Sequence, residues 1–217
     1  MKRLVIICEG PTEQEFIRDV LEPHFTSKNI FIQTPLIKKS AGGIVPWKIL
    51  KDQILGHLRE GNSTVTTLID YYGIPDKFKY PEWDESKSIV DRAERMTFLE
   101  SAMLNQIPDD LRNRFMPYYQ LHEFEGLLFN NLDSFEATFE SSEFKDKPEL
   151  IRILDQYPNP ELINDNPKNA PSKRLYRLID GYNKIVYGTI LADNIGLVNL
   201  RAKSPRFNNW ITQLETI

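Results

Sequence analysis

Hydrophobic residues form short blocks of two different periods along the first seventy positions. Residues 4–8 (LVIIC) are a continuous apolar run, which is typical of a strand buried on both faces of a parallel sheet. Residues 30–37 and 64–69 are rich in β-branched side chains and predict two further strands. Apolar residues recur at helical spacing over about 13–22 and again from Pro46 to Gly61. The order βαβαβ predicts a parallel sheet covered by helices.

The rest of the chain is mainly helical. Residues 71–87 contain Gly and Pro without periodicity and predict a loop, and residues 115–121 predict a fourth strand. We expect helices over 89–105, 147–156, 172–187 and 205–216, with an irregular connection or lid over 157–171. The residues of 89–105 expected to face the core are Val90, Ala93, Met96, Thr97 and Met103. These elements predict an α/β core over about 1–130 and a helical C-terminal extension over 131–217 that packs on it.

Composition limits the classes of partner and compartment. The 217 residues include 27 Lys and Arg against 31 Asp and Glu, a net charge of −4, so bulk charge cannot hold a nucleic acid and any anionic partner needs a local basic patch. The first apolar run is too short for a signal peptide, and no run approaches the roughly 20 residues of a membrane helix. Cys8 is the only cysteine, which excludes an internal disulfide. We therefore expect a cytoplasmic protein without a membrane partner.

Carboxylates stand where the predicted strands end. Glu9 follows the first strand with Glu13 one helical turn later, Asp70 ends the third strand, and Glu123 and Glu125 follow the fourth. Carboxyl ends of parallel strands meet at one sheet edge, where ligands collect. Five converging acids repel one another unless a cation neutralises them, and oxygen ligands select Mg²⁺ or Mn²⁺. The set predicts a divalent-metal site.

Plainer interpretations exist for each acid taken singly. Acids at exposed strand ends are common, and Glu13 also suits the positive end of a helix. His122 with Glu123 begins a zinc-protease pattern, but Gly126 stands where the second histidine is required. The turn at residues 10–12 lacks the glycine spacing and lysine of a phosphate loop, which disfavours an ATPase or a dinucleotide enzyme.

Basic residues gather in two C-terminal segments. Ser172 can cap a helix, which would leave Lys173 and Arg174 in its first turn, where cations oppose the helix dipole and favour an anionic partner. An ordinary solvated face is an equal alternative. The second segment contains Arg201, Lys203 and Arg206. We expect these five side chains to contact phosphate groups of a nucleic acid.

Several segments carry a family resemblance. Residues 8–16 (CEGPTEQEF) resemble the Glu-Gly-x-x-Glu opening of TOPRIM domains in nucleases of the overcoming-lysogenisation-defect family, and residues 70–75 (DYYGIP) correspond to the later aspartate motif. Residues 122–129 (HEFEGLLF), 170–175 (APSKRL) and 207–211 (FNNWI) resemble a bacterial TOPRIM-like family of uncharacterised function, of the domain-of-unknown-function 4276 type. One departure is that Tyr72 replaces the second aspartate of the motif.

The resemblance implies a TOPRIM-like parallel sheet and a Mg²⁺- or Mn²⁺-dependent nuclease. Glu9, Glu13, Asp70 and Glu125 would be catalytic, and these four together with Glu123 would hold metal. It also favours DNA over RNA as the substrate and implies that an ABC- or AAA-type ATPase encoded nearby is a partner. A role in bacterial defence or DNA maintenance is expected, and the resemblance allows a homo-oligomer. The alternatives are a non-catalytic docking subunit of an ATPase complex, favoured by the missing aspartate, and a small-molecule phosphotransferase or nucleotide hydrolase.

Overall fold

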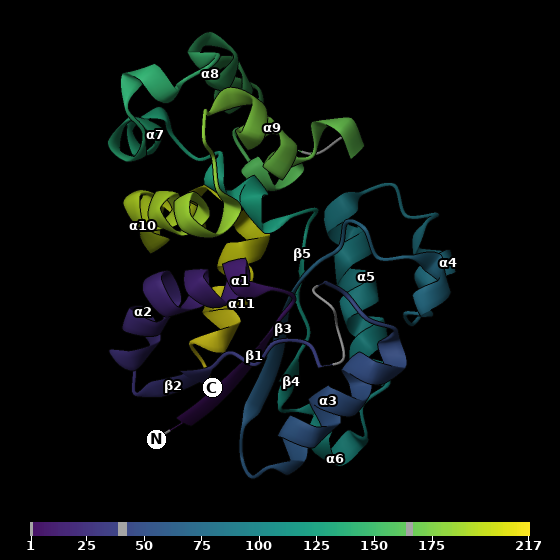
Figure 1. Ribbon diagram of the computed structural model, residues 1–217. Coiled ribbons are helices and arrows are strands. Elements are labelled where there is room, and N and C mark those ends of the chain that lie inside the picture. The colour runs from purple at the N-terminus through teal and green to yellow at the C-terminus, as the bar shows by residue number, and fades with distance from the viewer. Residues whose placement is uncertain (1, 39–42, 164–166) are drawn as a thin grey trace.

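The computed structural model describes residues 2–38, 43–163 and 167–217. Within them a five-stranded parallel sheet has the strand order β2-β1-β3-β4, and β5 extends the edge by also pairing with β3 (Figure 1). The strands are β1 Lys2–Cys8, β2 Ile30–Gln33, β3 Thr64–Asp70, β4 Phe115–Met116 and β5 Tyr119–Gln120. The α/β class predicted from the sequence is therefore confirmed.

Helices cover both faces of the sheet (Figure 1). One face carries α1 Pro11–Phe16, the π-helical turn η1 Ile17–Leu21, α2 Glu22–Thr26, the 3₁₀ turn η3 Phe124–Leu128, α10 Lys184–Lys203 and α11 Pro205–Leu214. The other face carries α3 Trp47–Arg59, η2 Asp76–Phe78, α4 Trp83–Ser86, α5 Arg92–Asn105 and α6 Asp109–Arg112. The remaining elements are α7 Leu132–Thr138, η4 Ser141–Glu143, α8 Lys147–Gln156, η5 Pro160–Leu162, η6 Pro167–Asn169 and α9 Pro171–Leu178. Within the described ranges, no helix is both long and apolar enough to cross a membrane.

Side chains of β1 alternate between two hydrophobic cores. Leu4, Ile6 and Cys8 belong to the core on the α1 face. Val5 and Ile7 belong to the core on the α3 face. Because successive side chains of a strand point to opposite faces, a strand between two helical layers must be apolar at every position. The continuous apolar run of residues 4–8 has this cause.

The strand order changes direction between β1 and β3. The helices that follow β1 lie on one face and lead outward to β2, whereas α3 lies on the other face and leads back past β1 to β3. The carboxyl ends of β1 and β3 are adjacent, with Cys8 in register with Leu68. In open α/β sheets ligands bind at such a switch point.

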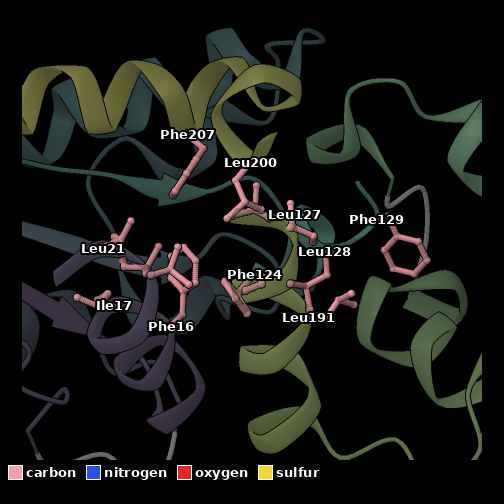
Figure 2. Packing of buried hydrophobic residues seen from close by; sticks show 14 of the residues in the cluster. Phe16, Ile17, Leu21, Phe124, Leu127, Leu128, Phe129, Leu191, Leu200 and Phe207 are labelled. Atoms are coloured by element: carbon pink, nitrogen blue, oxygen red, sulfur yellow. The ribbon is translucent and has the colours of Figure 1, made fainter. Parts of the chain in front are cut away.

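The C-terminal helices complete the core on the α1 face. Figure 2 shows Phe16 of α1, Phe124 of η3, Leu191 of α10 and Phe207 of α11 meeting in one cluster. The ring of Phe16 lies 4.8 Å from that of Phe124 and 6.0 Å from that of Phe207, measured between centroids. Residues beyond 130 therefore share the hydrophobic core of the first half of the chain.

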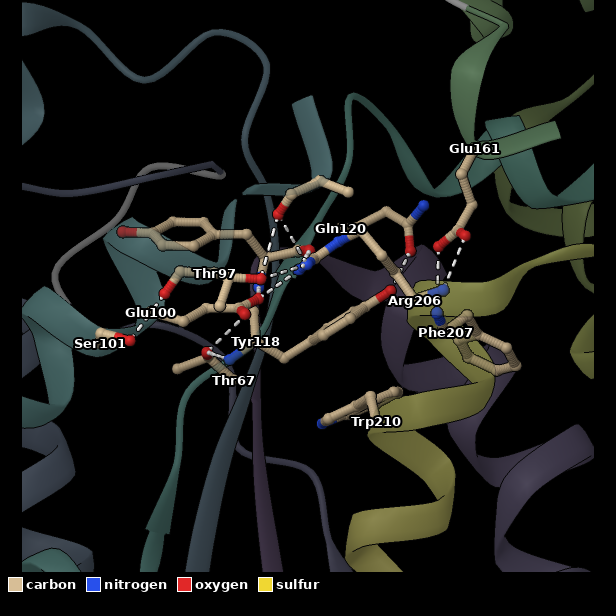
Figure 3. Close-up of polar contacts among 12 residues, drawn as sticks. Thr67, Thr97, Glu100, Ser101, Tyr118, Gln120, Glu161, Arg206, Phe207 and Trp210 are labelled. Atoms are coloured by element: carbon tan, nitrogen blue, oxygen red, sulfur yellow. Dashed lines mark hydrogen bonds and ion pairs between the residues drawn. The ribbon is translucent and has the colours of Figure 1, made fainter. Parts of the chain in front are cut away.

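A buried polar network joins α11 to the sheet (Figure 3). The Arg206 guanidinium forms an ion pair with Glu100 of α5 and donates to the Tyr119 carbonyl. The Glu161 carboxylate accepts the backbone N–H groups of Arg206 at 2.9 Å and of Phe207 at 3.0 Å, so it caps the start of α11. Charged groups survive burial only when they are paired in this way.

Several predicted boundaries are wrong. The strand predicted over 30–37 stops at Gln33, because Pro35 lacks the N–H group that a ladder needs, although Leu36 still bridges to Cys8. The strand predicted over 115–121 is divided into β4 and β5. The helix predicted over 172–187 is two helices, because Asn183 accepts two backbone N–H groups and starts α10.

The segments around α4 and α5 also differ from prediction. The segment 71–87, predicted to be a loop, contains the short helices η2 and α4. Trp83 of α4 is 8% exposed and packs into the core on the α3 face, which holds this segment against the sheet. The helix predicted to begin at residue 89 begins at Arg92, where Asp91 accepts the N–H of Glu94. Val90 was expected to face inward but lies before the helix and is 90% exposed.

Trp210 is the clearest test of the packing between α11 and the sheet. Its ring stacks on Tyr118 at 4.5 Å between centroids, and its indole N–H donates to the Thr66 hydroxyl at 2.9 Å. We expect Trp210→Ala to lower the free energy of unfolding by about 3–5 kcal/mol in urea denaturation. Val198→Ala, at a residue that is 81% exposed, should change it by less than about 0.5 kcal/mol. Equal effects of the two substitutions would contradict this packing.

Candidate functional site

Glu9 and Asp70 meet at the switch point of the sheet. Glu9 follows β1, and its carboxylate Oε2 accepts the backbone N–H of Asp70 at 3.1 Å. Asp70 is the last residue of β3, and its Oδ1 accepts the backbone N–H of Phe124 at 3.0 Å. Two carboxylates are thus held by main-chain donors of neighbouring segments, which limits their freedom to move.

A sharp turn at His122 brings Glu123 to the same edge. The backbone N–H of Tyr72 donates to the His122 carbonyl at 3.1 Å, so the chain after β5 continues beside the end of β3. His122 adopts φ 78°, in the left-handed region that few residues other than glycine occupy, and the chain reverses there. The Glu123 carboxylate then accepts the backbone N–H of Ser172 at 3.0 Å. Ser172 was expected to cap this helix, but it lies inside α9 and its side chain does not cap it; the Glu123 carboxylate accepts a backbone N–H of the first turn instead.

Glu13 and Glu125 are buried beside this edge. Glu13 is 4% exposed, and its Oε2 accepts the backbone N–H of Gly10 at 2.8 Å, three residues earlier at the start of α1. Glu125 lies on η3 and is fully buried. Its Oε1 is 2.8 Å from the ammonium group of Lys184, which is the first residue of α10. A cation at a helix N-terminus opposes the dipole, so the carboxylates around Lys184 must offset that cost.

The pKa values of the acids show that they share one electrostatic environment. Burial raises the pKa of Asp70 well above its usual range, and repulsion from Glu9, Glu13 and Glu125 raises it further against the opposing charge of Lys184. Burial likewise raises the pKa of Glu9, although the N–H of Asp70 and the charge of Lys184 oppose it. The same neighbouring acids and the same ammonium group therefore act on the pKa values of both Glu9 and Asp70.

The pKa of Glu13 is shifted toward neutral pH. Burial raises its pKa to about 7 against the charge of Lys184, and repulsion from Glu125 and Glu9 contributes to the rise. Burial also raises the pKa of Glu125, opposed first by Lys184. For Lys184, burial works to lower the pKa, but the ion pair with Glu125 and the nearby Asp70 and Glu13 outweigh it and the pKa rises. Lys184 stays protonated while Glu13 can exchange a proton near pH 7.

Two buried oxygens at the site have no hydrogen-bond donor or acceptor among the described residues. They are Oε2 of Glu125 and the hydroxyl of Tyr182. Buried polar atoms are almost always satisfied in native proteins, so unsatisfied ones indicate a position for a ligand, a water or an ion. Gly188 lies at the same place, since a Cβ there would come within 3.4 Å of the Tyr182 hydroxyl.

The carboxylate set suits a hard divalent cation in its chemistry, since all the candidate donors are oxygens and one is an unsatisfied buried oxygen of Glu125. The arrangement is not that of a ready ligand set. Across residues 2–38, 43–163 and 167–217, no three Asp, Glu, His or Cys side chains are grouped closely enough to hold a metal ion. Binding would therefore require these side chains to shift toward one another.

The basic residues selected from the sequence are dispersed over the C-terminal helices. Lys173 is exposed on α9, whereas Arg174 is 5% exposed and donates to the Asn169 carbonyl at 2.8 Å. Arg201 pairs with Glu215 at 2.7 Å. Lys203 donates to the Asn130 carbonyl, and Arg206 is held in the network with Glu100. The contacts of the last three are structural and do not point to a shared phosphate surface.

Sequence reasoning missed Lys184 and Tyr182. Lys184 follows Asn183, a residue typical of a helix start, so it stands in a first turn where a cation is unfavourable. The same argument was applied to Lys173 and could have selected Lys184. The Tyr182 hydroxyl had no signal in the sequence, because its burial depends on the packing of α9 and α10.

Comparison with family models gives a match over most of the chain. Residues 8–215 match a family model described as Domain of unknown function (DUF4276). Neither the curated proteins nor the solved structures contain a match.

The raised pKa of Glu13 predicts a pH-dependent stability. The folded protein binds this proton more tightly than the unfolded chain, so stability is lost as pH rises from about 4.5 through about 7. Replacing Glu13 by Gln removes the loss. The free energy of unfolding of Glu13→Gln relative to wild type should increase by about 3 kcal/mol between pH 4 and pH 8.

The measurement is urea denaturation in EDTA over that pH range. Glu15→Gln is the matched control, because Glu15 lies on the same helix but is partly exposed and paired with Arg18. Its difference from wild type should stay nearly constant. A constant difference for Glu13→Gln as well would contradict the raised pKa.

Lys184 predicts a second electrostatic effect. Lys184→Met keeps the length of the side chain but leaves the buried acids without their cation. We expect a loss of about 3–5 kcal/mol in the free energy of unfolding at pH 8, and a smaller loss at pH 5, where protonation of Glu13 removes part of the repulsion. The same urea measurements test this. A loss that is independent of pH would show that packing, not charge, is its cause.

Proposed function

Because the chain belongs to the family described as Domain of unknown function (DUF4276), which specifies no activity, we propose its function from the site: a Mg²⁺- or Mn²⁺-dependent nuclease that hydrolyses phosphodiester bonds. Glu9, Asp70 and Glu123 would hold the metal, and Glu13 or Glu125 would hold a second ion or act as general base. When bound, the metal would polarise the phosphate and stabilise developing negative charge.

One observation supports this proposal above the others. Four acids from three separate segments, Glu9, Glu13, Asp70 and Glu125, repel one another around a single ammonium group at the switch point of the sheet. Burying several carboxylates costs several kcal/mol for each ion, and one lysine cannot neutralise four of them. Groups with such perturbed pKa values in a ligand-binding position are typical of functional sites.

The protonation states suit proton transfer near neutral pH. Glu13, with a pKa of about 7, can accept a proton from an attacking water and release it again. Lys184 remains charged and can donate hydrogen bonds to phosphate oxygens if its contact with Glu125 opens. The Glu123 carboxylate at the start of α9 couples that helix to the site.

The proposal extends to partners and location. We place the protein in the cytoplasm, acting on DNA in preference to RNA with an ABC- or AAA-type ATPase, in bacterial defence or DNA maintenance. The TOPRIM relationship rests on the sequence resemblance and on the parallel sheet with acids at its carboxyl edge.

A non-catalytic docking subunit is the second candidate. It is favoured by the absence, in the described residues, of a closely grouped set of three ligands. The position where the motif would have its second aspartate is Tyr72, which leaves Asp70 as the only acid contributed by the end of β3. Calorimetric titration with Mn²⁺ separates the candidates, because a docking module has no saturable site.

The activity test uses two isosteric substitutions, Glu9→Gln and Asp70→Asn. Each removes one carboxylate charge and leaves an amide oxygen that can accept the same backbone N–H. We expect each to lower Mn²⁺-dependent nicking of plasmid DNA, or degradation of RNA, by roughly 100-fold or more. Gel assays with and without EDTA measure this.

Glu15→Gln is again the control, since its side chain pairs with Arg18 and should leave cleavage unchanged. Wild-type cleavage by both site variants would exclude this site. Saturable Mn²⁺ binding without cleavage of either nucleic acid, in the absence and in the presence of the ATPase partner, would instead favour a small-molecule substrate, whereas the absence of saturable binding would favour the docking role.

A further inference from the structure

Tyr72 lies at the carboxylate edge, next to two of the acids that the proposed function uses as metal ligands. It comes two residues after Asp70, the last residue of β3. Its backbone N–H donates to the His122 carbonyl at 3.1 Å, and His122 is followed directly by Glu123. A main-chain hydrogen bond therefore fixes Tyr72 between the segments that carry Asp70 and Glu123.

Among the residues that the structure describes, Tyr72 is the one tyrosine whose side chain has no ring contact and no hydrogen bond. The other eight of the nine tyrosines each make at least one such contact. The preceding residue, Tyr71, has its ring 5.3 Å from that of Trp83, between centroids, and its hydroxyl accepts from Arg95 at 3.3 Å. The ring of Tyr72 is partly exposed and belongs to neither hydrophobic core.

The position of this ring matters more than its exposure. Single exposed aromatic side chains are common on protein surfaces and need no explanation by themselves. Tyr72, however, lies at the edge of an open α/β sheet where ligands bind. Burial and the charge of Glu123 raise the pKa of Tyr72, so its hydroxyl stays protonated and its ring uncharged at neutral pH. An uncharged aromatic face can bind the flat face of a base without repelling the phosphates of the strand.

We propose that the Tyr72 ring stacks on an unpaired base, so that the carboxylate edge binds single-stranded nucleic acid. Stacking of this kind is tolerant of sequence, because every base has a π-face. It requires an accessible base face, which a base inside a duplex lacks until it is unstacked. Cleavage of the bound strand rests on the proposed function, but stacking of a base on Tyr72 does not.

A groove of about 830 Å³ provides a route for the rest of the strand. Arg92 lines this groove and lies 3.0 Å from the ring of His122, the residue whose carbonyl accepts the N–H of Tyr72. Two apolar side chains also line it, Val90 with 90% and Leu162 with 43% of its surface exposed. A guanidinium group suits a phosphate, and exposed apolar side chains suit the bases.

Two acids line the same groove. Asp91 is engaged at the start of α5, where its carboxylate accepts the backbone N–H of Glu94 at 2.8 Å. The side chain of Glu94 is exposed, so its charge would repel the phosphates of a strand in the groove. Removing that charge should therefore tighten binding.

The test is fluorescence anisotropy of a fluorescein-labelled oligothymidylate with the full chain, in EDTA so that no metal-dependent cleavage removes the probe. Tyr72→Ala should weaken binding roughly tenfold or more, because the stacked ring is lost. Tyr72→Phe keeps the ring and should bind within about twofold of wild type. Glu94→Gln should bind severalfold more tightly, and changes of opposite sign cannot come from a general loss of folding. A duplex of the same length should bind more weakly than the single strand.

Phe31→Ala is the matched control, because Phe31 is a 43% exposed aromatic residue on β2, at the opposite edge of the sheet. It should bind as wild type does. The absence of saturable binding to wild type, or equal binding by Tyr72→Ala and Phe31→Ala, would overturn the stacking. Unchanged binding by Glu94→Gln would overturn the route through the groove.

The outcome is separable from that of the activity test. Binding that depends on Tyr72, without Mn²⁺-dependent cleavage of any nucleic acid, would support the stacking and contradict the nuclease. Mn²⁺-dependent cleavage by wild type, with single-strand binding that Tyr72→Ala leaves unchanged, would support the nuclease and overturn the stacking.

Discussion

Repulsion among buried carboxylates is the constraint on which the organisation of this protein depends. Parallel pairing of β1 with β3 places Glu9 and Asp70 side by side, and the turn at His122 adds Glu123 and Glu125 to the same edge. A fold selected for stability alone would not bury these charges, because their desolvation is costly and a single lysine offsets only part of it. The surrounding elements supply the backbone donors and the ammonium group that make the burial tolerable.

Two of those compensating groups, the backbone donor to Glu123 and the ammonium group, come from the C-terminal helices. The backbone N–H of Ser172, at the start of α9, donates to the Glu123 carboxylate. Lys184, the first residue of α10, forms an ion pair with Glu125. The same helices pack against α1 and η3 in one hydrophobic core (Figures 1 and 2). The site is therefore assembled jointly by the sheet and the C-terminal helices, and its electrostatics cannot be understood from the first 130 residues alone.

The arginines illustrate how tertiary contacts divide residues of one chemical type. Arg206 is enclosed between α11, α5 and β5, where its charge is matched by Glu100 and its role is to hold the network of Figure 3. Arg201 is likewise matched by Glu215. Arg177, by contrast, makes long contacts with the side-chain oxygen of Asn169 beside a cavity. The sequence analysis expected both Arg201 and Arg206 to contact phosphate, but their burial and their acidic partners show that both are held in structural contacts.

The sequence by itself determined the α/β class and the positions of the main acids. The continuous apolar runs in the sequence correspond to the buried strands β1 and β3. Glu9 and Asp70 follow or end these strands, and they lie at the same edge of the sheet because parallel strands point in the same direction. Only the tertiary structure decided that β1 and β3 are neighbours, that Glu123 meets α9, and that Lys184 enters the acidic cluster. These features depend on contacts between residues far apart in the chain, and local periodicity carries no information about such contacts.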